Sequence, residues 1–465
     1  MILIVNPKLI VQRHDTFTTG IVYMPVSLAY ICGGLQQSGV DYKVIDLFGE
    51  KPNNVTEGNG FWSFGANLED VVSIDDIHPS HVLIFANQAA NHSEIISTVS
   101  QLRNSYPLSR ILVLENSQAV TAYSLTPLKG LFLDAGANDV LVGDPFIQAK
   151  RLLEMLSEFE FNSEEVLPDW SQFPLKNYWK AKLSHGPQTS ESYLPILTSF
   201  GCPWGCSFCV IPATNNRKWV TRSTSQISRE ISSAKQVLGV KEFHFEDLNS
   251  TVSTKRIREI ATAIKPLKID WKIVAGTKAE TLDSFETLRH LKTSGLSYFS
   301  FSPESGSRKI RRIIDKRFDV KHSLSLITWS RRLKIRSQAC FIMGMPGESR
   351  IDRFKSLNLI RLYTMLGISE VAIFIISPMP GSALFSEYKV DLDSISFSPD
   401  WRKDYKKLSA IRIYWYLNFL VFKVTFHPIE IVRSVVRFVS HQFVLKMEIA
   451  PYRSRQWKRW AKKLN

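Results

Sequence analysis

Three of the five cysteines lie within eight residues, at Cys202, Cys206 and Cys209. Thiolates are soft ligands that suit iron–sulfur clusters and zinc. A CxxxCxxC loop offers three thiolates to a four-iron cluster, so that the fourth iron has no protein ligand and is free to hold a small molecule. Pro203 and Gly205 favour a loop over a helix between the cysteines, as wrapping around a cluster requires. The spacing therefore predicts an open iron–sulfur cluster at the centre of the chemistry.

Two other interpretations of these cysteines stay open. A closed structural zinc site needs a fourth ligand, but the sequence has no second CxxC and no paired histidines, and neither His185 nor His244 has motif spacing. The cysteines could also be plain structural residues, although a disulfide would leave one of the three unpaired. Cys32 and Cys340 lie far apart within apolar patterns, so both are expected to be buried small hydrophobic side chains.

The cysteine loop resembles the signature of the radical S-adenosylmethionine superfamily, in which an aromatic residue, here Phe208, precedes the last cysteine. The resemblance implies a four-iron four-sulfur (4Fe-4S) cluster whose open iron chelates the amino and carboxylate groups of S-adenosylmethionine. An electron from the cluster then cleaves the sulfonium to give a 5′-deoxyadenosyl radical. Phe208 is expected to lie beside the cofactor.

Apolar runs alternate with helical patterns after residue 192, which predicts a barrel of strand–helix units. The first strand, at residues 194–199, would deliver Cys202 at its carboxyl end, where barrels place their active sites. Further strands are expected at residues 242–245, 271–275, 298–302, 338–343 and 370–376, and helices at residues 225–238, 255–264, 285–294 and 320–333. Six such units suit the partial (β/α)6 barrel of TIM type that the superfamily uses, here over residues 192–395.

The resemblance also implies a role for two acidic residues after the second strand. Glu246 and Asp247 match the position whose acidic or backbone groups meet the ammonium of S-adenosylmethionine. A carboxylate is a natural partner for a cation in a partly dry pocket. Each could instead cap the following helix.

Later strands end in further matches to the superfamily. Ser302, Glu304 and Ser305 resemble the segment near the ribose and carboxylate of the cofactor. Met343 and Gly344 resemble the segment that packs against adenine, although Pro-Gly pairs such as the one that follows often only form turns. These residues complete the expected set of cofactor contacts.

Residues 1–150 alternate short apolar runs with helical patterns, which predicts a doubly wound parallel α/β sheet. Strands are expected at residues 2–5, 42–46, 81–86, 111–114 and 139–142, and helices at residues 28–37, 93–106 and 125–135, the second with Ser93 as N-cap. Ligands of such sheets bind outside the carboxyl ends of the strands. The loops expected to line the site follow Val5, Asp46, Ala86, Leu114 and Val142.

This half resembles the Rossmann-like (flavodoxin-like) cobalamin-binding domain that is fused to many radical S-adenosylmethionine enzymes, through residues 24–30, 44–46 and 135–144. The DxHxxG signature that supplies a histidine to cobalt is absent, because Asp76 and His78 are followed by His81 where the glycine would stand. The resemblance thus implies cobalamin without a motif histidine. The alternatives are a vestigial or purely structural domain, since sheet topology does not fix the ligand; a nicotinamide site would need a GxGxxG loop.

Residues 151–191 carry scattered prolines and aromatic residues and are interpreted as an extended linker. Residues 396–465 form a basic, aromatic, helical C-terminal segment, with 15 lysines and arginines against 4 aspartates and glutamates from residue 400 onward. An apolar stripe is expected at Val432, Val435, Val436, Val439 and Phe443, with Arg433 and Arg437 on the other side. No run reaches the roughly 18 uncharged residues that span a bilayer. The segment is either a helical cap on the barrel or a helix pair on an anionic membrane surface.

The combined patterns predict a cobalamin-dependent radical S-adenosylmethionine enzyme, most simply a C- or P-methyltransferase on an unactivated centre. A radical cyclase or rearrangement enzyme is the alternative within the superfamily, and a non-catalytic cofactor-binding or membrane-associated protein is the alternative outside it. Methylthiotransferases need a second cluster, whereas the N-terminal region has only Cys32. The expected partners are a small-molecule or lipid substrate and an external electron donor of flavodoxin or ferredoxin type, without nucleic acid. The first residues lack the pattern of a signal peptide, so a cytoplasmic location is expected, with peripheral contact at the inner membrane surface as a variant of it.

Overall fold

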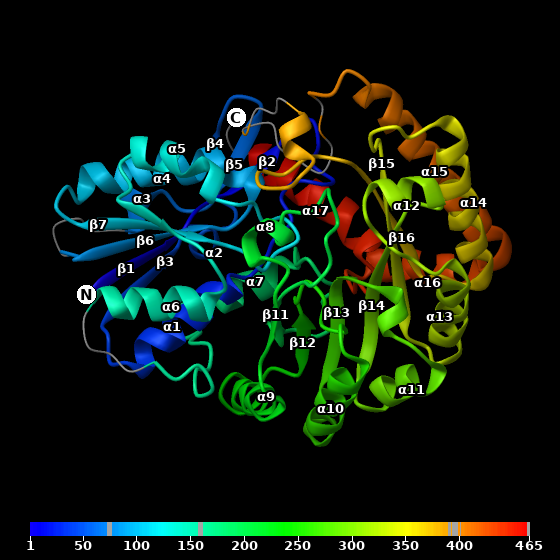
Figure 1. The fold of residues 1–465 in the computed structure, drawn as a ribbon, viewed down its shortest axis with the longest axis horizontal. Helices are drawn as coiled ribbons and strands as arrows, with labels where there is room; N and C mark the ends of the chain where they lie inside the picture. The colour runs from blue at the N-terminus through cyan, green and yellow to red at the C-terminus, as the bar shows by residue number, and fades with distance from the viewer. Residues whose placement is uncertain (72–76, 157–160, 389–391, 393–398, 400, 463–465) are drawn as a thin grey trace.

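The computed structural model describes residues 1–71, 77–156, 161–388, 392, 399 and 401–462 (Figure 1). Two parallel sheets lie next to each other, and the C-terminal helices run from the far side of the second sheet back to the first. Asp76 and the expected boundary between residues 395 and 396 fall outside the described residues.

The N-terminal sheet has five parallel strands in the order β3-β1-β6-β7-β8, the flavodoxin-like order. Its strands are β1 (Ile2–Asn6), β3 (Tyr42–Asp46), β6 (His81–Ala86), β7 (Arg110–Glu115) and β8 (Asp139–Leu141). Helices α1 (Val26–Gln37) and α6 (Pro145–Met155) cover one face, and α4 (His92–Ser105) and α5 (Lys129–Asp134) cover the other. Alternate residues of β1 divide between the two cores, as a strand buried on both faces requires. The predicted doubly wound sheet is confirmed.

Local details of this half differ from the sequence prediction. Helix α4 begins one residue earlier, so Asn91 and not Ser93 stands at its N-cap. The Asn91 side chain caps nothing, because it accepts a hydrogen bond from the Ile10 amide and donates one to Asn87. An antiparallel sheet was not predicted at all; it consists of β2 (Leu9–Gln12), β5 (Phe61–Phe64) and β4 (Val55–Glu57).

The second sheet has six parallel strands in sequential order from β9 to β16, as the partial barrel requires. The strands are β9 (Leu194–Ile196), β12 (Glu242–Phe245), β13 (Asp270–Thr277), β14 (Leu296–Glu304), β15 (Arg336–Met343) and β16 (Glu370–Ile375). The helices between them are α9 (Thr224–Leu238), α10 (Thr254–Ile264), α11 (Phe285–Thr293), α13 (Val320–Arg332) and α14 (Arg350–Leu366). The predicted six-stranded partial barrel is confirmed.

The first barrel strand is shorter than predicted. After β9 the chain leaves the sheet and forms a hairpin of β10 (Ser199–Gly201) with β11 (Trp219–Thr221). The Asp247 carboxylate fixes the chain where it leaves the sheet. It accepts hydrogen bonds from the Thr198 amide and hydroxyl and from the Ser199 hydroxyl. The remaining short helices are α2 (Leu47–Glu50), α3 (Leu68–Val71), α8 (Ile211–Asn215) and α12 (Arg308–Ile313).

The linker region is packed against the N-terminal half and contains a helix, α7 (Leu175–Ala181), that an extended connector would lack. Trp170 and Tyr178 are buried, and the Tyr178 hydroxyl donates to the Asp46 carboxylate at 2.7 Å. These contacts fix the linker to the first sheet.

Three helices form the C-terminal segment: α15 (Tyr405–Phe426), α16 (Pro428–Val439) and α17 (Lys446–Ala461). Helix α15 packs on α14 and on the edge strand β16, where the Tyr416 hydroxyl accepts a hydrogen bond from the Ile373 amide. Helix α17 crosses to the N-terminal half, where Trp457 packs against Phe64. The segment therefore covers one edge of the barrel, as the cap interpretation expects. None of the described helices combines the length and apolar character that crossing a bilayer requires.

Candidate active site

A cavity of about 1070 Å3 lies where the two sheets and the C-terminal helices meet. Its walls come from the cysteine loop, from the inward side chains of β13 to β16, from two loops of the N-terminal half, and from α15 and α17. Pockets for one small molecule usually measure about 300–1,000 Å3. This cavity is large enough for more than one ligand.

All three cysteines of the loop line this cavity. Gly201, just before the loop, has a left-handed φ of 77°, and a Cβ there would meet the carbonyl oxygen of Lys218 at 2.2 Å, so only glycine fits. The Cys209 amide donates to the Cys206 carbonyl at 3.1 Å, which closes the turn between the last two cysteines. The backbone of Ser207 is bonded to Ile314 on one side and to Leu384 on the other. The loop is thus held from both flanking segments.

Burial makes these thiols hard to ionise without a cation. It raises the pKa of Cys202 to about 11 and that of Cys209 to about 12, and it raises the pKa of Cys206 as well. A bound metal ion deprotonates a coordinating thiol outright. Three soft thiolate donors on one cavity wall, in surroundings that disfavour free thiolates, fit an iron–sulfur cluster.

Within the residues that the structure describes, no group of three or more His, Cys, Asp or Glu side chains converges on a single metal ion. A cube-shaped cluster needs no such convergence, because each thiolate takes a different iron. The two histidines considered as a fourth zinc ligand have other partners: His185 contacts Glu246, and His244 contacts Glu242.

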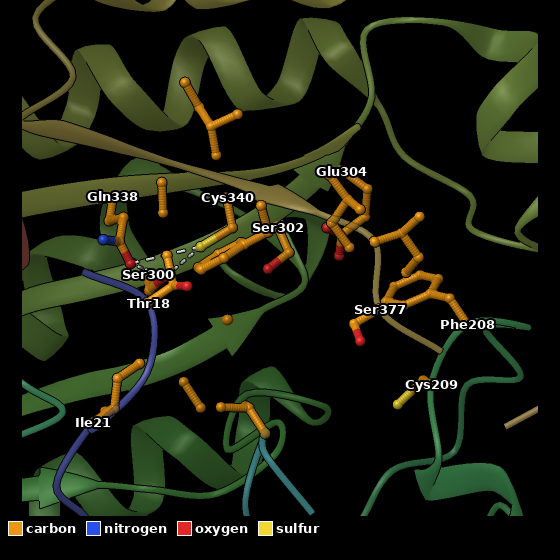
Figure 2. Close-up of a pocket in the computed structure, with 18 of the residues that line it drawn as sticks. Thr18, Ile21, Phe208, Cys209, Ser300, Ser302, Glu304, Gln338, Cys340 and Ser377 are labelled. Carbon is orange, nitrogen blue, oxygen red and sulfur yellow. Dashed lines mark hydrogen bonds between the residues drawn. The ribbon is translucent and has the colours of Figure 1, made fainter. Parts of the chain in front are cut away.

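The cavity wall beside the cysteine loop holds a polar group that lacks a partner among the described residues. Figure 2 shows Ser377 next to Phe208 and Cys209. The buried Ser377 hydroxyl has no hydrogen-bond partner among the described residues, although it lines the cavity. Phe208 also lines the cavity and packs with apolar residues behind it. An unpaired hydroxyl at this position fits a polar ligand bound beside the cysteine loop.

The inward side chains of β14 and β15 form a polar strip across the cavity (Figure 2). Ser300 and Ser302 alternate with buried apolar residues of β14, because side chains of a strand point to opposite faces in turn. Ser300 donates to the Gln338 side chain at 3.0 Å and lies 3.4 Å from the Cys340 sulfur. Cys32 is fully buried as expected, but Cys340 faces the cavity, so its prediction as a simple core residue is wrong.

Glu304 lines the cavity at the end of β14, in a left-handed conformation with φ of 58°. Its carboxylate forms an ion pair of 2.6 Å with Lys316, and both side chains are largely buried. Burial alone would lower the pKa of Lys316, but its contact with the Glu304 carboxylate and the nearby Cys206 and Cys202 sulfurs raises that pKa overall. Lys316 therefore places a positive charge next to the cysteine loop. Nothing in the local sequence singles out this lysine.

Five of the predicted cofactor contacts do not line the cavity. The Asp247 carboxylate is occupied by Thr198 and Ser199, as described above, and Glu246 is buried against His185. The other three are as follows: Ser305 contacts Ser356, Met343 is fully buried, and the Gly344 amide donates to Glu348. Phe208, Ser302 and Glu304 do line it. The role of all eight as cofactor contacts remains a prediction.

A buried chain of three titratable side chains links the barrel to α17. Glu246 bonds His185 Nδ1 at 2.9 Å, and Lys446 Nζ lies 3.1 Å from His185 Nε2. Burial and the Lys446 charge lower the pKa of His185 to about 4, and burial also lowers that of Lys446. The neutral imidazole accepts from Lys446 and donates to Glu246. Because 261 positions separate His185 from Lys446, no sequence motif could have joined them.

Two of the five loops predicted to line the site reach the cavity. One is the connection from β1 to α1, which contains β2 and then Thr18 and Ile21 (Figure 2). The other is the segment after β7, with Ala119 and Ala122. The prediction is wrong for the loops after Asp46, Ala86 and Val142, which are absent from the described cavity wall. Their polar groups bond within the N-terminal half instead.

Residues 196–360 match the sequence model of the radical SAM superfamily. The cysteine loop and most of the partial barrel lie within this match, which identifies this region as a radical SAM domain.

Two curated relatives and two solved structures extend this assignment. The chain is 25% identical to cytidylyl-2-hydroxyethylphosphonate methyltransferase of Streptomyces wedmorensis over 83% of this chain and 81% of that one. It is 26% identical to bacteriochlorophyllide d C-12(1)-methyltransferase of Chlorobaculum tepidum over 42% of each chain. The fold is similar to the radical S-adenosylmethionine methyltransferase TsrM of Kitasatospora setae, solved with cobalamin and a [4Fe-4S] cluster, with a TM-score of 0.59 at 12% identity over 83% of this chain and 77% of that one. It is similar as well to the cobalamin-dependent enzyme OxsB, with a TM-score of 0.61 at 14% identity over all of this chain and 80% of that one.

The similarity in fold includes the N-terminal sheet as well as the barrel, since the match to OxsB covers the whole chain. The barrel region of the chain thus matches the radical SAM superfamily, and the whole chain shares its fold with these structures.

Proposed function

We propose that this protein is a cobalamin-dependent methyltransferase that places a methyl group on an unactivated carbon or phosphorus centre. One observation carries the proposal: a single cavity brings together the cysteine loop, the polar inner face of the barrel and two loops of the flavodoxin-like sheet. Two cofactors and a substrate must meet within a few ångströms for a short-lived radical to be used. The methyltransferase names of the two curated relatives support the same class of reaction.

Each part of the cavity wall has a task in this proposal. Cys202, Cys206 and Cys209 hold the cluster, and the loops after β1 and β7 face the cobalamin. When bound, the cluster with S-adenosylmethionine supplies one-electron chemistry, and cobalamin supplies the methyl group. Lys316 offsets negative charge beside the cysteines through its contact with Glu304.

We further propose the division of the chain into residues 1–150, 151–191, 192–395 and 396–465. An external electron donor of flavodoxin or ferredoxin type would approach the cysteine loop, where Arg217 and Lys218 are exposed and match an acidic partner. A cytoplasmic location belongs to the same proposal.

The decisive experiment compares two cysteine variants after anaerobic reconstitution. Cys206→Ala removes a proposed iron ligand, and Cys340→Ala removes a cysteine of the same cavity that lies outside the loop. We expect Cys206→Ala to lose bound iron and at least 1000-fold in 5′-deoxyadenosine formation, on the order of 4 kcal/mol. Cys340→Ala should keep its iron.

Product analysis separates the candidate reactions. Transfer of a labelled methyl group from S-adenosylmethionine supports a methyltransferase, whereas turnover without label in the product supports a cyclase or rearrangement. Equal iron contents in both cysteine variants would contradict a cluster bound by the cysteine loop. Full turnover without cobalt would contradict the use of cobalamin.

A further inference from the structure

Helix α16 is amphipathic, but its apolar side faces away from the protein. Five apolar residues on this side are exposed: Ile429, Val432, Val435, Val436 and Val439. The opposite side faces the protein and is mixed: Ser434 and Arg437 bond Glu448 of α17, and Phe438 packs against Phe443. A surface helix of a soluble protein normally buries its apolar stripe. The orientation of α16 is the reverse.

Helix α15, which packs beside α16, also has an exposed apolar side. It packs against α14, β16 and α16 through buried residues such as Trp415 and Phe419. Its outer side exposes Ile413, Tyr414, Leu417, Leu420, Val421 and Val424. We call these six residues and the five of α16 the apolar face. Figure 1 shows α15 and α16 along the edge of the molecule farthest from the N-terminal sheet.

Positive charge surrounds the apolar face. Lys403, Lys406 and Lys407 at the start of α15 are exposed, as is Arg433 of α16. The acidic residues that the structure describes in the C-terminal segment are neutralised within it: Asp404 by Arg402, Glu430 by Lys423, and Glu448 by Arg437. The excess charge of this surface is therefore positive. Each lysine or arginine near an anionic lipid surface contributes about 1 kcal/mol to binding.

The large cavity reaches the apolar face. Helix α15 turns Tyr405, Ser409, Arg412 and Tyr416 toward the cavity. Ile413 belongs to both surfaces, because it lines the cavity while 57% of it is exposed. Ile413 is thus a point where the apolar face and the cavity wall meet, with Arg412 beside it on the cavity side.

We propose that the apolar face rests on an anionic lipid bilayer, and that the substrate is a lipid whose apolar chain enters the cavity beside Ile413. The second half rests on the proposed methyltransferase function. A second copy of the chain suits this surface less well, because two copies would bring the same positive residues together. An anionic bilayer instead accepts both the apolar residues and the basic residues around them.

Vesicle flotation of the full chain without cluster tests the first half. Val432 and Val436 are 62% and 61% exposed, so Val432→Glu with Val436→Glu removes apolar contact without disturbing the core. Val237 of α9, which is 77% exposed and outside the apolar face, supplies the control Val237→Glu. We expect the wild type and the control to float with phosphatidylglycerol vesicles, and the double variant to bind at least tenfold less. High salt and pure phosphatidylcholine should both weaken binding.

Two results would overturn the membrane contact. One is equal flotation of the double variant and the wild type. The other is that light scattering finds a dimer for the wild type and a monomer for the double variant, while neither protein binds vesicles. The apolar face would then join two copies of the chain.

A fluorescent probe tests the substrate class. Dansyl-undecanoic acid carries a long apolar chain and reports binding by its emission. We expect Ile413→Glu to weaken probe binding at least fivefold and the Val432→Glu, Val436→Glu variant to leave it unchanged. Equal affinity of Ile413→Glu and wild type would show that no chain enters beside Ile413.

These binding assays need neither the cluster nor cobalamin. Loss of both binding signals with intact 5′-deoxyadenosine formation would reject the lipid inference and leave the methyltransferase proposal standing. If the protein binds vesicles and the probe but the reconstituted protein does not cleave S-adenosylmethionine, the methyltransferase proposal is rejected and the membrane contact stands.

Discussion

The two parallel sheets use the carboxyl ends of their strands differently. In the N-terminal sheet, the Asn6 side chain donates to Asp46 and accepts from Asn87, which accepts in turn from Asn91. In the barrel, Ser302 stands in the wall of an open cavity. Both sheets have the topology that places ligands at strand ends. In the barrel, the cavity wall takes polar side chains from strand ends, such as Ser302 and Ser377, whereas the end of β3 in the N-terminal sheet turns Asp46 to partners within the protein.

This contrast shows that a polar residue at a strand end is an incomplete indication of a binding site. Its hydrogen bonds decide whether it serves the fold or a ligand, because a buried polar group must find a partner somewhere. Asp247 and Asp46 satisfy that need within the protein. The predictions below test this division, starting with the largest expected effect.

Lys316→Met should destabilise the barrel most. It leaves the Glu304 carboxylate buried without its partner, and breaking one side of a buried ion pair costs about 3–5 kcal/mol. Urea unfolding would measure the loss. The double variant Lys316→Met, Glu304→Met should recover most of it, and a single variant as stable as the wild type would contradict a structural role for the pair.

Glu115, at the end of β7, should make stability depend on pH. Burial raises the pKa of Glu115 to about 7, so the folded protein holds a proton that the unfolded chain releases above its ordinary pKa of 4.5. The unfolded state then binds fewer protons, and stability falls as the pH rises from about 4.5 to about 7, by about 3 kcal/mol. Glu115→Gln keeps an acceptor for the Leu125 amide and should remove this part of the slope.

The measurement is the melting temperature of both proteins between pH 5 and pH 8. Burial also raises the pKa of Asp46, to about 6. Asp46 therefore contributes a slope of the same sign in both proteins, and this contribution cancels when their melting curves are compared. Parallel curves would show that Glu115 titrates normally.

Asn6→Ala should cost about 2 kcal/mol of stability, because it leaves the Asn87 amide without its acceptor and removes one of the hydrogen bonds to Asp46, which keeps those from Gly49 and Tyr178. Iron content and the KM for S-adenosylmethionine should stay unchanged. A large change in KM at wild-type stability would place the N-terminal strand ends in the binding site.

Ser302→Ala, at the matching place in the barrel, should have the opposite profile. Stability should change by no more than about 0.5 kcal/mol, since the hydroxyl faces the cavity. The KM for S-adenosylmethionine should rise about fivefold, as loss of one hydrogen bond worth about 1 kcal/mol implies. An unchanged KM would remove Ser302 from the cofactor contacts.

Features encoded by short stretches of sequence could be predicted. Apolar runs located the strands of both sheets, because buried parallel strands are nearly continuous apolar segments. The cysteine spacing located the loop on the cavity wall. In the C-terminal segment the apolar stripe was predicted, but not its direction: most of it is exposed, while Phe443 is buried.

Features that depend on distant parts of the chain could not be predicted. Lys316 and Lys446 look like ordinary surface lysines in the sequence, and folding alone brings them to Glu304 and His185. The antiparallel sheet was missed because its strands are very short: β2 and β5 have four residues each and β4 has three, and β4 and β5 are partly exposed. Asp247 was expected at the cofactor, but nearer hydroxyl groups take its hydrogen bonds.

The crossing of α17 to the N-terminal half has a consequence for biosynthesis. Trp457 packs against Phe64, and Arg453 bonds the Phe17 carbonyl in the loop that faces the cavity. The ribosome makes Phe64 almost 400 residues before Trp457, and Phe17 is made 436 residues before Arg453. During translation, the wall of the cavity that α17 supplies therefore forms only after α17 has left the exit tunnel.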